Sequence, residues 1–529
     1  MEVQNSAETG TIHGLIKGAA EKYKQDTAFI EGDKRITFEE VDRLSLRMAK
    51  HLLYLGLKKG DVLAAQLPNS WEFVITHLAA SRIGIIFNPL SPAYRKKELA
   101  YMLAHCNTKA LVTMVSLKGV DHEKLALELK EELPSLEHVI VASLPKQEHS
   151  LSFARLLEEE PETMTEKDTE IHEPHEHDPA IILFTSGTES NPKAVLHTYE
   201  SFVPTHLKNG AEYKVTREDT ILSLTPLCHM FSMPMILIGL HRGAKHYLYR
   251  NYEISDAVNV LKMERVSFLI AAPAHLIDMI HYLKDKNVSG LNLRLILTGG
   301  SKIPAQMVKD LRSILGSRVG AQWGMSELCA GTFTRPGDEE ARAWETVGRV
   351  SPSGDLKILH DDGSVLKTGE VGEIAFKGDS LFKEYVNNHA ATKEVFTKDG
   401  YFLTGDQGWL DEGGYLHFSG RTKDTINRGG LKFHASEIEE ALQMHPKIQQ
   451  AAVVSVPDER LGERGAAFIS LRENKLFDLE EMKEYLLNQG FAKYKIPEYI
   501  EIKESLPATP SGKVAKGYLR KEVNLWGKH

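Results

Sequence analysis

The chain has 529 residues, of which 42% are hydrophobic and 26% are charged, a balance that is ordinary for a globular protein. Its formal net charge of −9 argues against broad binding to nucleic acid or to an anionic membrane surface, because both require basic patches. The cysteines, Cys106, Cys228 and Cys329, form an odd and sparse set without a CxxC pair. The sequence therefore gives no disulfide or zinc framework and favours a reducing compartment.

The first residues, from Met1 to Ser6, carry neither the basic nor the apolar region of a signal peptide. No apolar run reaches the roughly 20 residues that a membrane-spanning helix needs. The final residues, Gly527 to His529, do not form a peroxisomal tripeptide. We therefore expect a cytoplasmic protein without integral membrane association and without nucleic-acid partners.

The first third of the chain alternates patterns typical of helices and of strands. Thr37 and Glu40 form a capping box, which predicts the start of a helix whose apolar residues follow at helical spacing. Runs typical of strands follow at Val62–Leu67, Ile83–Phe87 and Ala110–Val115. Strands that alternate with helices indicate parallel sheets with helices on their faces.

Residues 147–178 are acidic, and His172, His175 and His177 lie close together among glutamates. A metal site is one interpretation of these histidines. Their spacing matches no helical zinc motif, however, and Pro174 interrupts any helix. We therefore favour a solvated linker for this segment.

An apolar strand, Ile181–Phe184, runs directly into the sequence Thr-Ser-Gly-Thr-Glu-Ser-Asn-Pro-Lys, which ends at Lys193. Such a loop offers backbone N–H groups, hydroxyls and a flexible cation to a polyphosphate. It is not the Walker-type loop, because Pro192 precedes the lysine and Ala194 follows it. A cluster of this composition is also common in ordinary turns, so its interpretation depends on the rest of the chain.

Beyond this loop, strand and helix patterns alternate to about residue 330. Residues 347–418 then have the pattern of short antiparallel strands. Turn sequences at Asp361–Gly363, Asp399–Gly400 and Gly413–Gly414 join them.

The pattern changes again at Asp424, where a compact unit begins. Ser436 and Glu439 form a second capping box, Ala451–Val456 is typical of a strand, and a helix is expected near Leu479–Gln489. We predict two domains, a large one over residues 1–423 and a small one over residues 424–529.

The phosphate-type loop and five later segments resemble, in their order, the motifs of the adenylate-forming superfamily. This superfamily contains acyl-CoA synthetases, nonribosomal adenylation domains and luciferases. The later segments are residues 297–302 (Leu-Thr-Gly-Gly-Ser-Lys), 322–327 (Gln-Trp-Gly-Met-Ser-Glu), 401–406 (Tyr-Phe-Leu-Thr-Gly-Asp), 420–424 (Gly-Arg-Thr-Lys-Asp) and 506–513 (Leu-Pro-Ala-Thr-Pro-Ser-Gly-Lys). The resemblance covers essentially the whole chain, which looks most like an acyl-CoA synthetase for fatty or aryl acids.

The resemblance implies a fold of the α/β plus α+β class. We expect a large N-terminal domain of mostly parallel sheets with flanking helices and a small β-barrel-like part. A small, mobile α+β C-terminal domain is expected to follow.

The resemblance also implies which residues bind the nucleotide. In the family an aromatic ring stacks on adenine, here Trp323, and a carboxylate accepts hydrogen bonds from both ribose hydroxyls, here Asp406. The implied ATP- and AMP-binding residues are Thr185, Ser186, Gly187, Thr188, Lys193, Gly300, Ser301, Gln322, Trp323, Gly324, Ser326, Asp406, Arg421 and Lys513. In the family the lysine that corresponds to Lys513 enters the active site only while the adenylate is being made.

The other implied roles are catalysis, metal binding, hinge movement, and binding of CoA and of the acid. The implied catalytic residues are Lys513, Thr188, Glu327 and His229, and Glu327 with Thr188 would hold Mg²⁺. Asp424 would be the hinge, Gly429 and Gly430 would line the CoA tunnel, and His229, Phe231, Met233, Gly299 and Gly324 would line the acyl pocket. His229 is either a general base or a residue that shapes the pocket.

The implied activity is ATP-dependent ligation of an acid to coenzyme A through an acyl-adenylate. The substrates would be ATP, CoA and a monocarboxylic acid, and Met230, Met233 and Met235 suggest an adaptable acid pocket, although they could equally fill the core. The segment carries no acidic residue that could pair with an amino-acid ammonium. A departure from the family pattern is Glu189, which places a carboxylate in the phosphate loop.

Alternatives remain open at this point. The chain could be a stand-alone adenylation enzyme that loads a carrier protein, a luciferase-type monooxygenase, or a catalytically inert binding protein. The sequence does not identify the acid, and it leaves a homodimer open.

Overall fold

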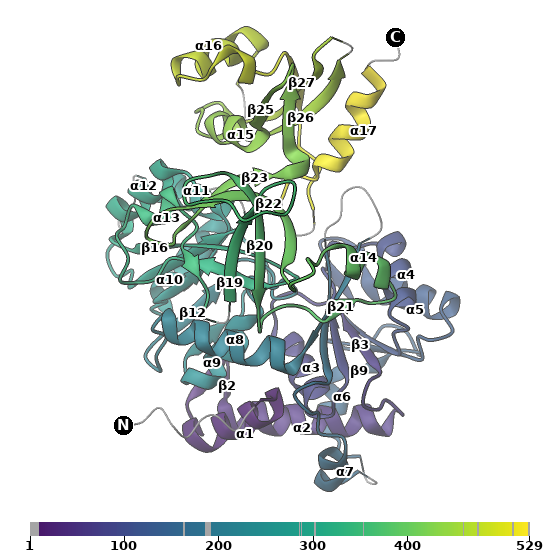
Figure 1. The fold of residues 1–529 in the computed structure, drawn as a ribbon. Helices are drawn as coiled ribbons and strands as arrows, with labels where there is room; N and C mark the ends of the chain where they lie inside the picture. Colours follow the sequence, from purple (N-terminus) through teal and green to yellow (C-terminus); the bar gives the residue numbers. More distant parts are fainter. Residues whose placement is uncertain are drawn as a thin grey trace.

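The computed structural model describes residues 10–161, 164–185, 192–284, 286, 288–300, 303–352, 354–458, 460–472, 475–509 and 513–526 (Figure 1). Two large sheets form the body of the molecule, and both are mostly parallel in their centres. This arrangement confirms the mixed α/β fold with parallel sheets expected from the alternation of strands and helices.

The larger sheet has nine strands. In spatial order they are β18 (Arg349–Val350), β17 (Cys329–Phe333), β16 (Arg318–Met325), β15 (Leu295–Gly299), β14 (Phe268–Ile270), β12 (Thr220–Ser223), β13 (Lys245–Tyr247), β1 (Thr27–Glu31) and β2 (Lys34–Thr37). The pairings from β16 through to β1 are parallel, and the outer strands β17, β18 and β2 pair antiparallel.

The second sheet has eight strands. In spatial order they are β21 (Glu384–Tyr385), β11 (Ala194–Thr198), β10 (Pro179–Phe184), β4 (Ile86–Pro89), β3 (Val62–Ala65), β5 (Ala110–Thr113), β8 (His138–Val141) and β9 (Leu151–Ser152). The short strands β6 (Ser116–Leu117) and β7 (Val120–Asp121) form a separate hairpin. The expected strand before the phosphate-type loop is β10, which is buried over Ala180–Phe184.

Helices pack against both sheets. They are α1 (Ile12–Tyr23), α2 (Phe38–Tyr54), α3 (Trp71–Arg82), α4 (Lys96–His105), α5 (His122–Glu132), α6 (Phe153–Glu158), α7 (Glu166–Ile171), α8 (Tyr199–Glu212), α9 (Pro234–Arg242), α10 (Ile254–Met263), α11 (Pro273–Leu283), α12 (Ala305–Leu315), α13 (Arg342–Glu345) and α14 (His389–Glu394). One apolar core joins α1, α2, α3, α8 and α9 with strands of both sheets. None of the described helices is both long enough and apolar enough to cross a membrane.

The expected β-barrel-like part is an antiparallel sheet of four strands: β19 (Gly354–Leu359), β20 (Gly372–Gly378), β22 (Phe402–Leu410) and β23 (Leu416–Arg421). The pairings among the described strands leave this sheet open rather than closed. The predicted turn glycines Gly363, Gly400 and Gly414 all have positive φ, which glycine adopts without steric cost.

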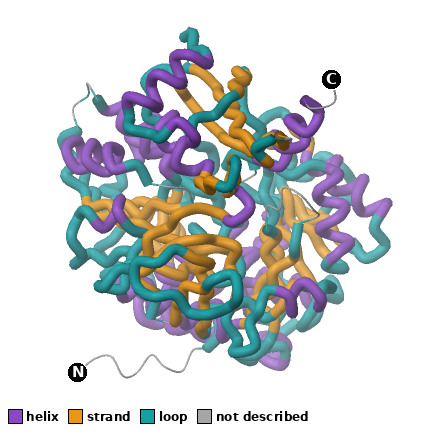
Figure 2. Tube along the Cα trace, turned by 45° about the horizontal axis from the view of Figure 1, so that its top comes forward, coloured by secondary structure: helices purple, strands orange, loops and turns teal. Residues whose placement is uncertain are grey.

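The C-terminal unit stands above the large body (Figures 1 and 2). Its five-stranded sheet contains β25 (Leu431–His434), β24 (Thr425–Arg428), β27 (Gly462–Leu471), β26 (Ile448–Asp458) and β28 (Tyr499–Lys503), and it packs with α15 (Ala435–Gln443), α16 (Leu479–Asn488) and α17 (Lys516–Trp526). The 3₁₀ turns are η1 (Thr422–Asp424) and η2 (Lys493–Lys495). The limits 1–423 and 424–529 stay predictions, although η1 lies between the last strand of one sheet and the first of the next.

Two expectations from the sequence are wrong in detail. Ser436 does not cap α15: the cap is His434, whose backbone N–H donates to Glu437, while Ser436 instead donates to the Ser419 carbonyl at 3.2 Å. The supposed solvated linker contains α6, whose Phe153 is buried in the core of the large body. In both cases contacts distant in sequence decide the local structure.

Candidate active site

The C-terminal unit brings Lys513 to the end of β15. A Cβ atom added at Gly300 would lie 3.3 Å from Cε and 3.4 Å from Nζ of Lys513. The residue as a whole is exposed, but its ammonium lies against the large unit. Burial, and then the charge of Arg421, lower the pKa of Lys513 to about 8, and Asp406 opposes this shift. The Lys513 ammonium of the C-terminal unit thus lies within the electrostatic influence of Asp406 and Arg421 of the large unit.

Asp406 is held by two neighbours and is 5% exposed. The indole Nε1 of Trp323 donates to its Oδ2 at 2.8 Å, and the guanidinium of Arg421 lies 3.5 Å from its Oδ1. Burial raises the pKa of Asp406, while Arg421, Trp323 and Lys513 act in the opposite direction. Asp406 and Arg421 are directly opposite residues of β22 and β23, so sheet register sets their pairing.

Trp323 packs in a core cluster with only 6% of its surface exposed. Its measured contact is the hydrogen bond to Asp406. The structure therefore gives the ring a positioning contact, and adenine stacking on it stays a prediction.

Glu327 is a buried carboxylate beside a phenol and a lysine. The Tyr385 hydroxyl donates to its Oε1 at 3.0 Å, and the Nζ atom of Lys193 lies 4.4 Å from the centre of the Tyr385 ring. Burial raises the pKa of Glu327, and the Tyr385 hydrogen bond and Lys193 oppose the shift. Oxygen ligands in such a place suit a hard cation.

Two backbone contacts fix the segment that carries Glu327. His197 contacts the Ser326 carbonyl through Nε2 at 2.6 Å and the Ser201 hydroxyl through Nδ1 at 3.1 Å. The Phe382 N–H donates to the Glu327 carbonyl at 2.8 Å. Burial lowers the pKa of His197 to about 4, so the imidazole is neutral and positions the segment rather than titrating near neutral pH.

Thr185 and Lys193 close the base of the phosphate-type loop. The Thr185 N–H donates to the Lys193 carbonyl at 3.0 Å, and the Lys193 N–H donates to the Thr185 hydroxyl at 3.3 Å. The predicted residues between them, Ser186, Gly187 and Thr188, lie outside the described residues, as do Glu189 and Ser301.

Glycine is required at positions 299 and 324, because the backbone of a neighbouring strand lies too close for a side chain. A Cβ at Gly299 would lie 2.3 Å from the Gln322 carbonyl oxygen, and one at Gly324 would lie 2.0 Å from that of Cys329. Gln322 itself accepts a hydrogen bond from the Tyr213 hydroxyl at 2.7 Å. The predicted pocket roles of both glycines stay predictions.

The segment predicted to meet the acid is anchored by Asn69, a residue that the sequence did not single out. Its amide nitrogen donates to the carbonyls of Ser223 at 3.2 Å and Thr225 at 3.0 Å, and its oxygen accepts from the Leu227 N–H at 2.7 Å. No signal in one sequence separates this asparagine from an ordinary turn residue.

The predicted pocket residues of this segment have different surroundings. Phe231 packs partly buried against an apolar cluster that contains Tyr213 and Ala330. Met233 is fully buried in the core of the large body, as core filling would require. The backbone carbonyl of His229 accepts from the Ser232 and Met233 N–H groups, each at 3.1 Å.

The predicted hinge residue lies between the sheets of the two units, and the predicted tunnel residues lie in a turn of the C-terminal unit. Asp424 pairs with Arg520 and lies 3.5 Å from Lys516, both on α17. These cations lower its pKa although burial alone would raise it. Gly429 and Gly430 form the turn between β24 and β25 with φ of +61° and +88°.

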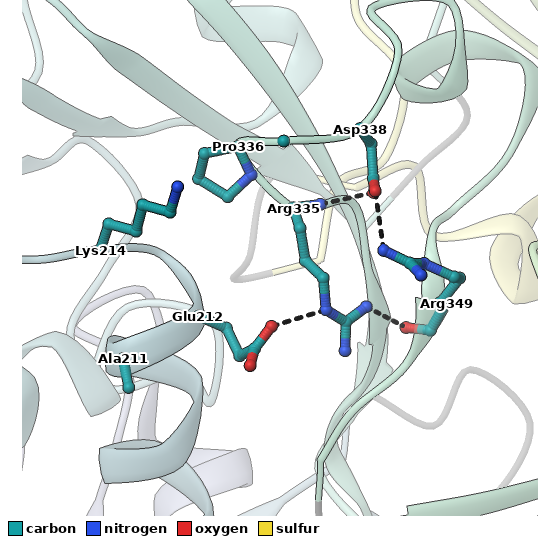
Figure 3. Close-up of a pocket in the computed structure, with 8 residues that line it drawn as sticks. Ala211, Glu212, Lys214, Arg335, Pro336, Asp338 and Arg349 are labelled. Carbon is teal, nitrogen blue, oxygen red and sulfur yellow. Dashed lines mark hydrogen bonds and ion pairs between the residues drawn. The ribbon is translucent and has the colours of Figure 1, made fainter.

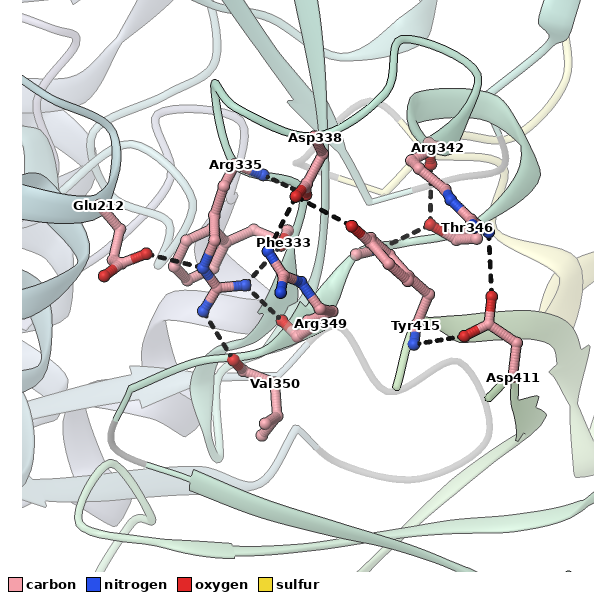
Figure 4. Close-up of polar contacts among 11 residues, drawn as sticks. Glu212, Phe333, Arg335, Asp338, Arg342, Thr346, Arg349, Val350, Asp411 and Tyr415 are labelled. Carbon is pink, nitrogen blue, oxygen red and sulfur yellow. Dashed lines mark hydrogen bonds and ion pairs between the residues drawn. The ribbon is translucent and has the colours of Figure 1, made fainter. Parts of the chain in front are cut away.

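A polar depression of the large body lies apart from these residues (Figure 3). Its lining residues are Ala211, Glu212, Lys214, Arg335, Pro336, Gly337, Asp338 and Arg349. Ion pairs fill it: Arg335 bonds to Glu212 at 2.6 Å and Arg349 to Asp338 at 2.8 Å. These pairs continue through the Tyr415 hydroxyl, which donates to Asp338 at 2.9 Å (Figure 4). We interpret this network as a structural tie between the end of α8, the segment after β17, β18 and the residue before β23, because none of the predicted site residues lines it.

Comparison with known proteins agrees with this geometry. The family model of AMP-binding enzymes matches residues 16–386, and that of the AMP-binding enzyme C-terminal domain matches residues 437–513. A medium-chain fatty-acid–CoA ligase of Escherichia coli is 30% identical over 92% of this chain and 86% of its own length. A 2,3-dihydroxybenzoate-AMP ligase of Bacillus subtilis is 29% identical over 97% of this chain and 94% of its own.

Among solved structures, the anthranilate CoA ligase AuaEII in complex with anthranoyl-AMP superposes with a TM-score of 0.88 and 23% identity, covering 98% of each chain. At that identity the likeness shows the fold. The fold and the resemblance predicted from the sequence are both confirmed. The chain belongs to the family of AMP-binding enzymes.

Proposed function

We propose that the protein is an AMP-forming acyl-CoA synthetase that activates a monocarboxylic acid with ATP and transfers it to coenzyme A. The observation that carries the proposal is the approach of Lys513 from the C-terminal unit to Gly300, with Asp406 and Arg421 beside it. ATP and CoA as substrates fit the family. The matched relatives named above are ligases of a fatty acid and of an aryl acid.

The first step joins the acid to AMP. A carboxylate oxygen attacks the α-phosphorus of ATP, the bond to the β-phosphate oxygen breaks, and pyrophosphate leaves. Because the acid is already ionised at neutral pH, no side chain needs to remove a proton, and catalysis rests on positioning and charge neutralisation. Lys513, which points to this place, supplies a cation for the phosphate oxygens.

The second step makes the thioester. The thiol of CoA attacks the acyl carbon, loses its proton, and AMP leaves with the pair of electrons of the broken bond. In this proposal Lys513 withdraws as the C-terminal unit turns about Asp424, and the turn of Gly429 and Gly430 lines the entry for the thiol.

Nucleotide binding in the proposal uses the contacts already described. Asp406 would accept the ribose hydroxyls, and its indole and guanidinium neighbours hold the carboxylate in place. Trp323, Gln322 and Gly324 would line the adenine side. Glu327 is a buried carboxylate that offers oxygen ligands. Burial raises its pKa, and a bound cation would compensate the negative charge of its ionised form. Glu327 and Thr188 would hold Mg²⁺, which when bound neutralises phosphate charge.

The acid would be a monocarboxylic acid without an ammonium group. Residues 230–235 carry no acidic side chain, and an unpaired buried ammonium would cost several kcal/mol. A cytoplasmic location and a homodimer are further predictions, which cell fractionation and light scattering would check.

Pyrophosphate release with ATP, Mg²⁺, CoA and an acid panel tests the proposed function, with the products identified by mass. We expect release that depends on an acid, and an acyl-CoA ester only when CoA is present. Release without any CoA ester, but with acylation of a carrier protein, would favour the stand-alone adenylation enzyme. Preferential turnover of an amino acid would contradict the proposed substrate class.

A further inference from the structure

Helix α8 carries a set of buried polar side chains that lack hydrogen-bond partners. Thr205, His206 and Asn209 are 1%, 2% and 2% exposed. The Thr205 hydroxyl, His206 Nε2, and both the oxygen and the nitrogen of the Asn209 amide have no partner among the residues that the structure describes. Leaving such a buried group without a hydrogen bond destabilises the folded protein.

Some equivalent groups elsewhere in the chain have hydrogen-bond partners. The buried helical hydroxyl of Thr76 donates to the carbonyl of Glu72, four residues earlier, at 2.7 Å. The buried amide of Asn69 uses both of its ends, as described above. Other buried groups also lack a partner among the described residues, including both ends of the Asn88 amide and the hydroxyls of Thr108 and Thr298. What distinguishes α8 is that four such atoms lie on three residues of one helix.

The polar groups point in one direction. At 3.6 residues per turn, Thr205, His206, Asn209 and Tyr213 fall within roughly 100° of arc around α8. The Tyr213 hydroxyl, at the end of this face, donates to Gln322 of β16 at 2.7 Å. Gln322 is the register partner of Gly299. The Tyr213 end of this face therefore borders the strand ends where the predicted nucleotide and acyl residues meet.

The same face adjoins the segment expected to meet the acid. Tyr213 belongs to the apolar cluster against which Phe231 packs. Helix α8 approaches α9 so closely that a Cβ at Gly210 would lie 2.8 Å from a methyl group of Ile238. Burial lowers the pKa of His206 to about 3, so this imidazole is neutral at neutral pH. The surroundings of this face are apolar, and its hydrogen-bonding groups are neutral. Burying a charged group of a ligand there would therefore be unfavourable.

We propose that Asn209 and Thr205 bind a hydroxyl group of the acid, so that the enzyme selects a hydroxylated monocarboxylic acid over its unsubstituted counterpart. This inference rests on the proposed function and names its substrate class more narrowly. An amide suits a hydroxyl because it can both donate and accept. A site built to hydrogen-bond a substrate hydroxyl also rejects the analogue that lacks it, since the protein groups are then left unpaired.

Acid-dependent pyrophosphate release tests the inference, with kcat/KM measured for matched pairs: benzoate against its three monohydroxy forms, and octanoate against hydroxyoctanoates. We expect the wild-type enzyme to prefer at least one hydroxylated member by at least about tenfold. The double variant Thr205→Val/Asn209→Leu should reduce that ratio by about tenfold or more, and its Tm should hold or rise because unpaired buried groups are removed.

Thr76→Val is the matched control, since it removes a buried helical hydroxyl that is already paired. It should lower Tm without changing the ratio between acids. An unchanged ratio in the double variant, or a wild-type enzyme that favours the unsubstituted acids, would overturn the inference and leave the proposed function standing. If instead a buried water molecule hydrogen-bonds to these side chains of α8, the double variant should have a lower Tm and an unchanged ratio of kcat/KM between the paired acids, which also overturns the inference. A wild-type enzyme that turns over no acid contradicts the proposed function itself, and the inference falls with it.

Discussion

At the scale of single residues, the hydrogen bond between Trp323 and Asp406 joins two residues of the predicted nucleotide site. The indole N–H and the Arg421 guanidinium both face a carboxylate that is almost fully buried. A buried carboxylate with two donors is fixed in orientation before ligand arrives. Pre-positioning of this kind reduces the ordering that binding requires.

Substitutions of Trp323 separate its two expected roles, stacking on adenine and hydrogen bonding to Asp406. Trp323→Ala should raise the KM for ATP by about 5–150-fold, equivalent to about 1–3 kcal/mol of stacking, while the KM for the acid changes little. Trp323→Phe keeps an aromatic ring, although a smaller one, and removes the N–H bond to Asp406, so it should have an intermediate effect. Steady-state kinetics with each substrate varied would measure both. An unchanged KM for ATP in the alanine variant would make Trp323 a core residue without a nucleotide role.

The pKa of Lys513 predicts a pH dependence. It is lowered to about 8 in the folded protein, so the ammonium is present below about pH 8 and is lost as pH rises through that value. We expect kcat/KM for ATP in the adenylation step, which reports groups of the free enzyme, to fall above about pH 8. Lys513→Arg, which stays charged, should be slower but should lose this alkaline limb. The same limb in the arginine variant would show that another group titrates.

At the scale of elements, strong local signals predicted structure well. The Thr37–Glu40 capping box is present at the start of α2, and α16 begins at Leu479 as expected. The prediction of a strand over Ile83–Phe87 is less accurate, because Ile83 is the C-cap of α3 and the strand β4 covers Ile86–Pro89. Apolar runs alone cannot separate the end of a buried helix from the strand after it.

The site was predictable only where a motif marks it. The motifs around Asp406 and Glu327 predict them as site residues, whereas Tyr385, which donates to Glu327, lies in an unmarked segment 58 residues away in sequence. The polar face of α8 was missed for the same kind of reason. Its residues form part of an ordinary helical pattern, and only the folded chain shows that they have no partners.

The turn of Gly429 and Gly430 gives a prediction for an element. Gly430 has φ of +88°, and no atom lies within 4 Å of a Cβ added there. Gly430→Phe should cost about 1–2 kcal/mol of stability through backbone strain and should slow thioester formation from a supplied acyl-adenylate, because the ring would obstruct the CoA tunnel.

Gly414→Phe is the control for this turn. Gly414 has φ of +73°, also has no atom within 4 Å of an added Cβ, and joins β22 to β23 in the large body. The Gly414→Phe variant should be destabilised by the same kind of backbone strain, but its rate of thioester formation should be unchanged. Equal slowing by both variants would remove the tunnel role of Gly430.

At the scale of the whole molecule, the account requires the C-terminal unit to change position between the two steps. In the present arrangement, Lys513 lies at Gly300 and Ser436 donates to Ser419 across the junction. Asp424, at the junction, is held by Arg520 and Lys516 of α17. We therefore predict that the pivot of this change lies in the backbone at η1, between β23 and β24.

Asp424→Pro tests this hinge. Proline fixes φ and removes the N–H, so we expect near-normal pyrophosphate release in a single turnover and strongly slowed formation of the CoA ester. Asp424→Ala is the matched control, since it removes the ion pairs with α17 and leaves φ free. Quench-flow measurement of both products would compare the variants. Normal rates of both steps in the proline variant would place the pivot elsewhere.

We expect Lys513 of the C-terminal unit to serve adenylation alone. The measurement is the rate of each half-reaction for Lys513→Ala: pyrophosphate release from ATP and acid, and CoA ester formation from a supplied acyl-adenylate. We predict that the first falls on the order of 10²–10³-fold, as when one donor to a developing charge is lost, and that the second stays close to the wild-type rate. Equal loss in both half-reactions would contradict the account.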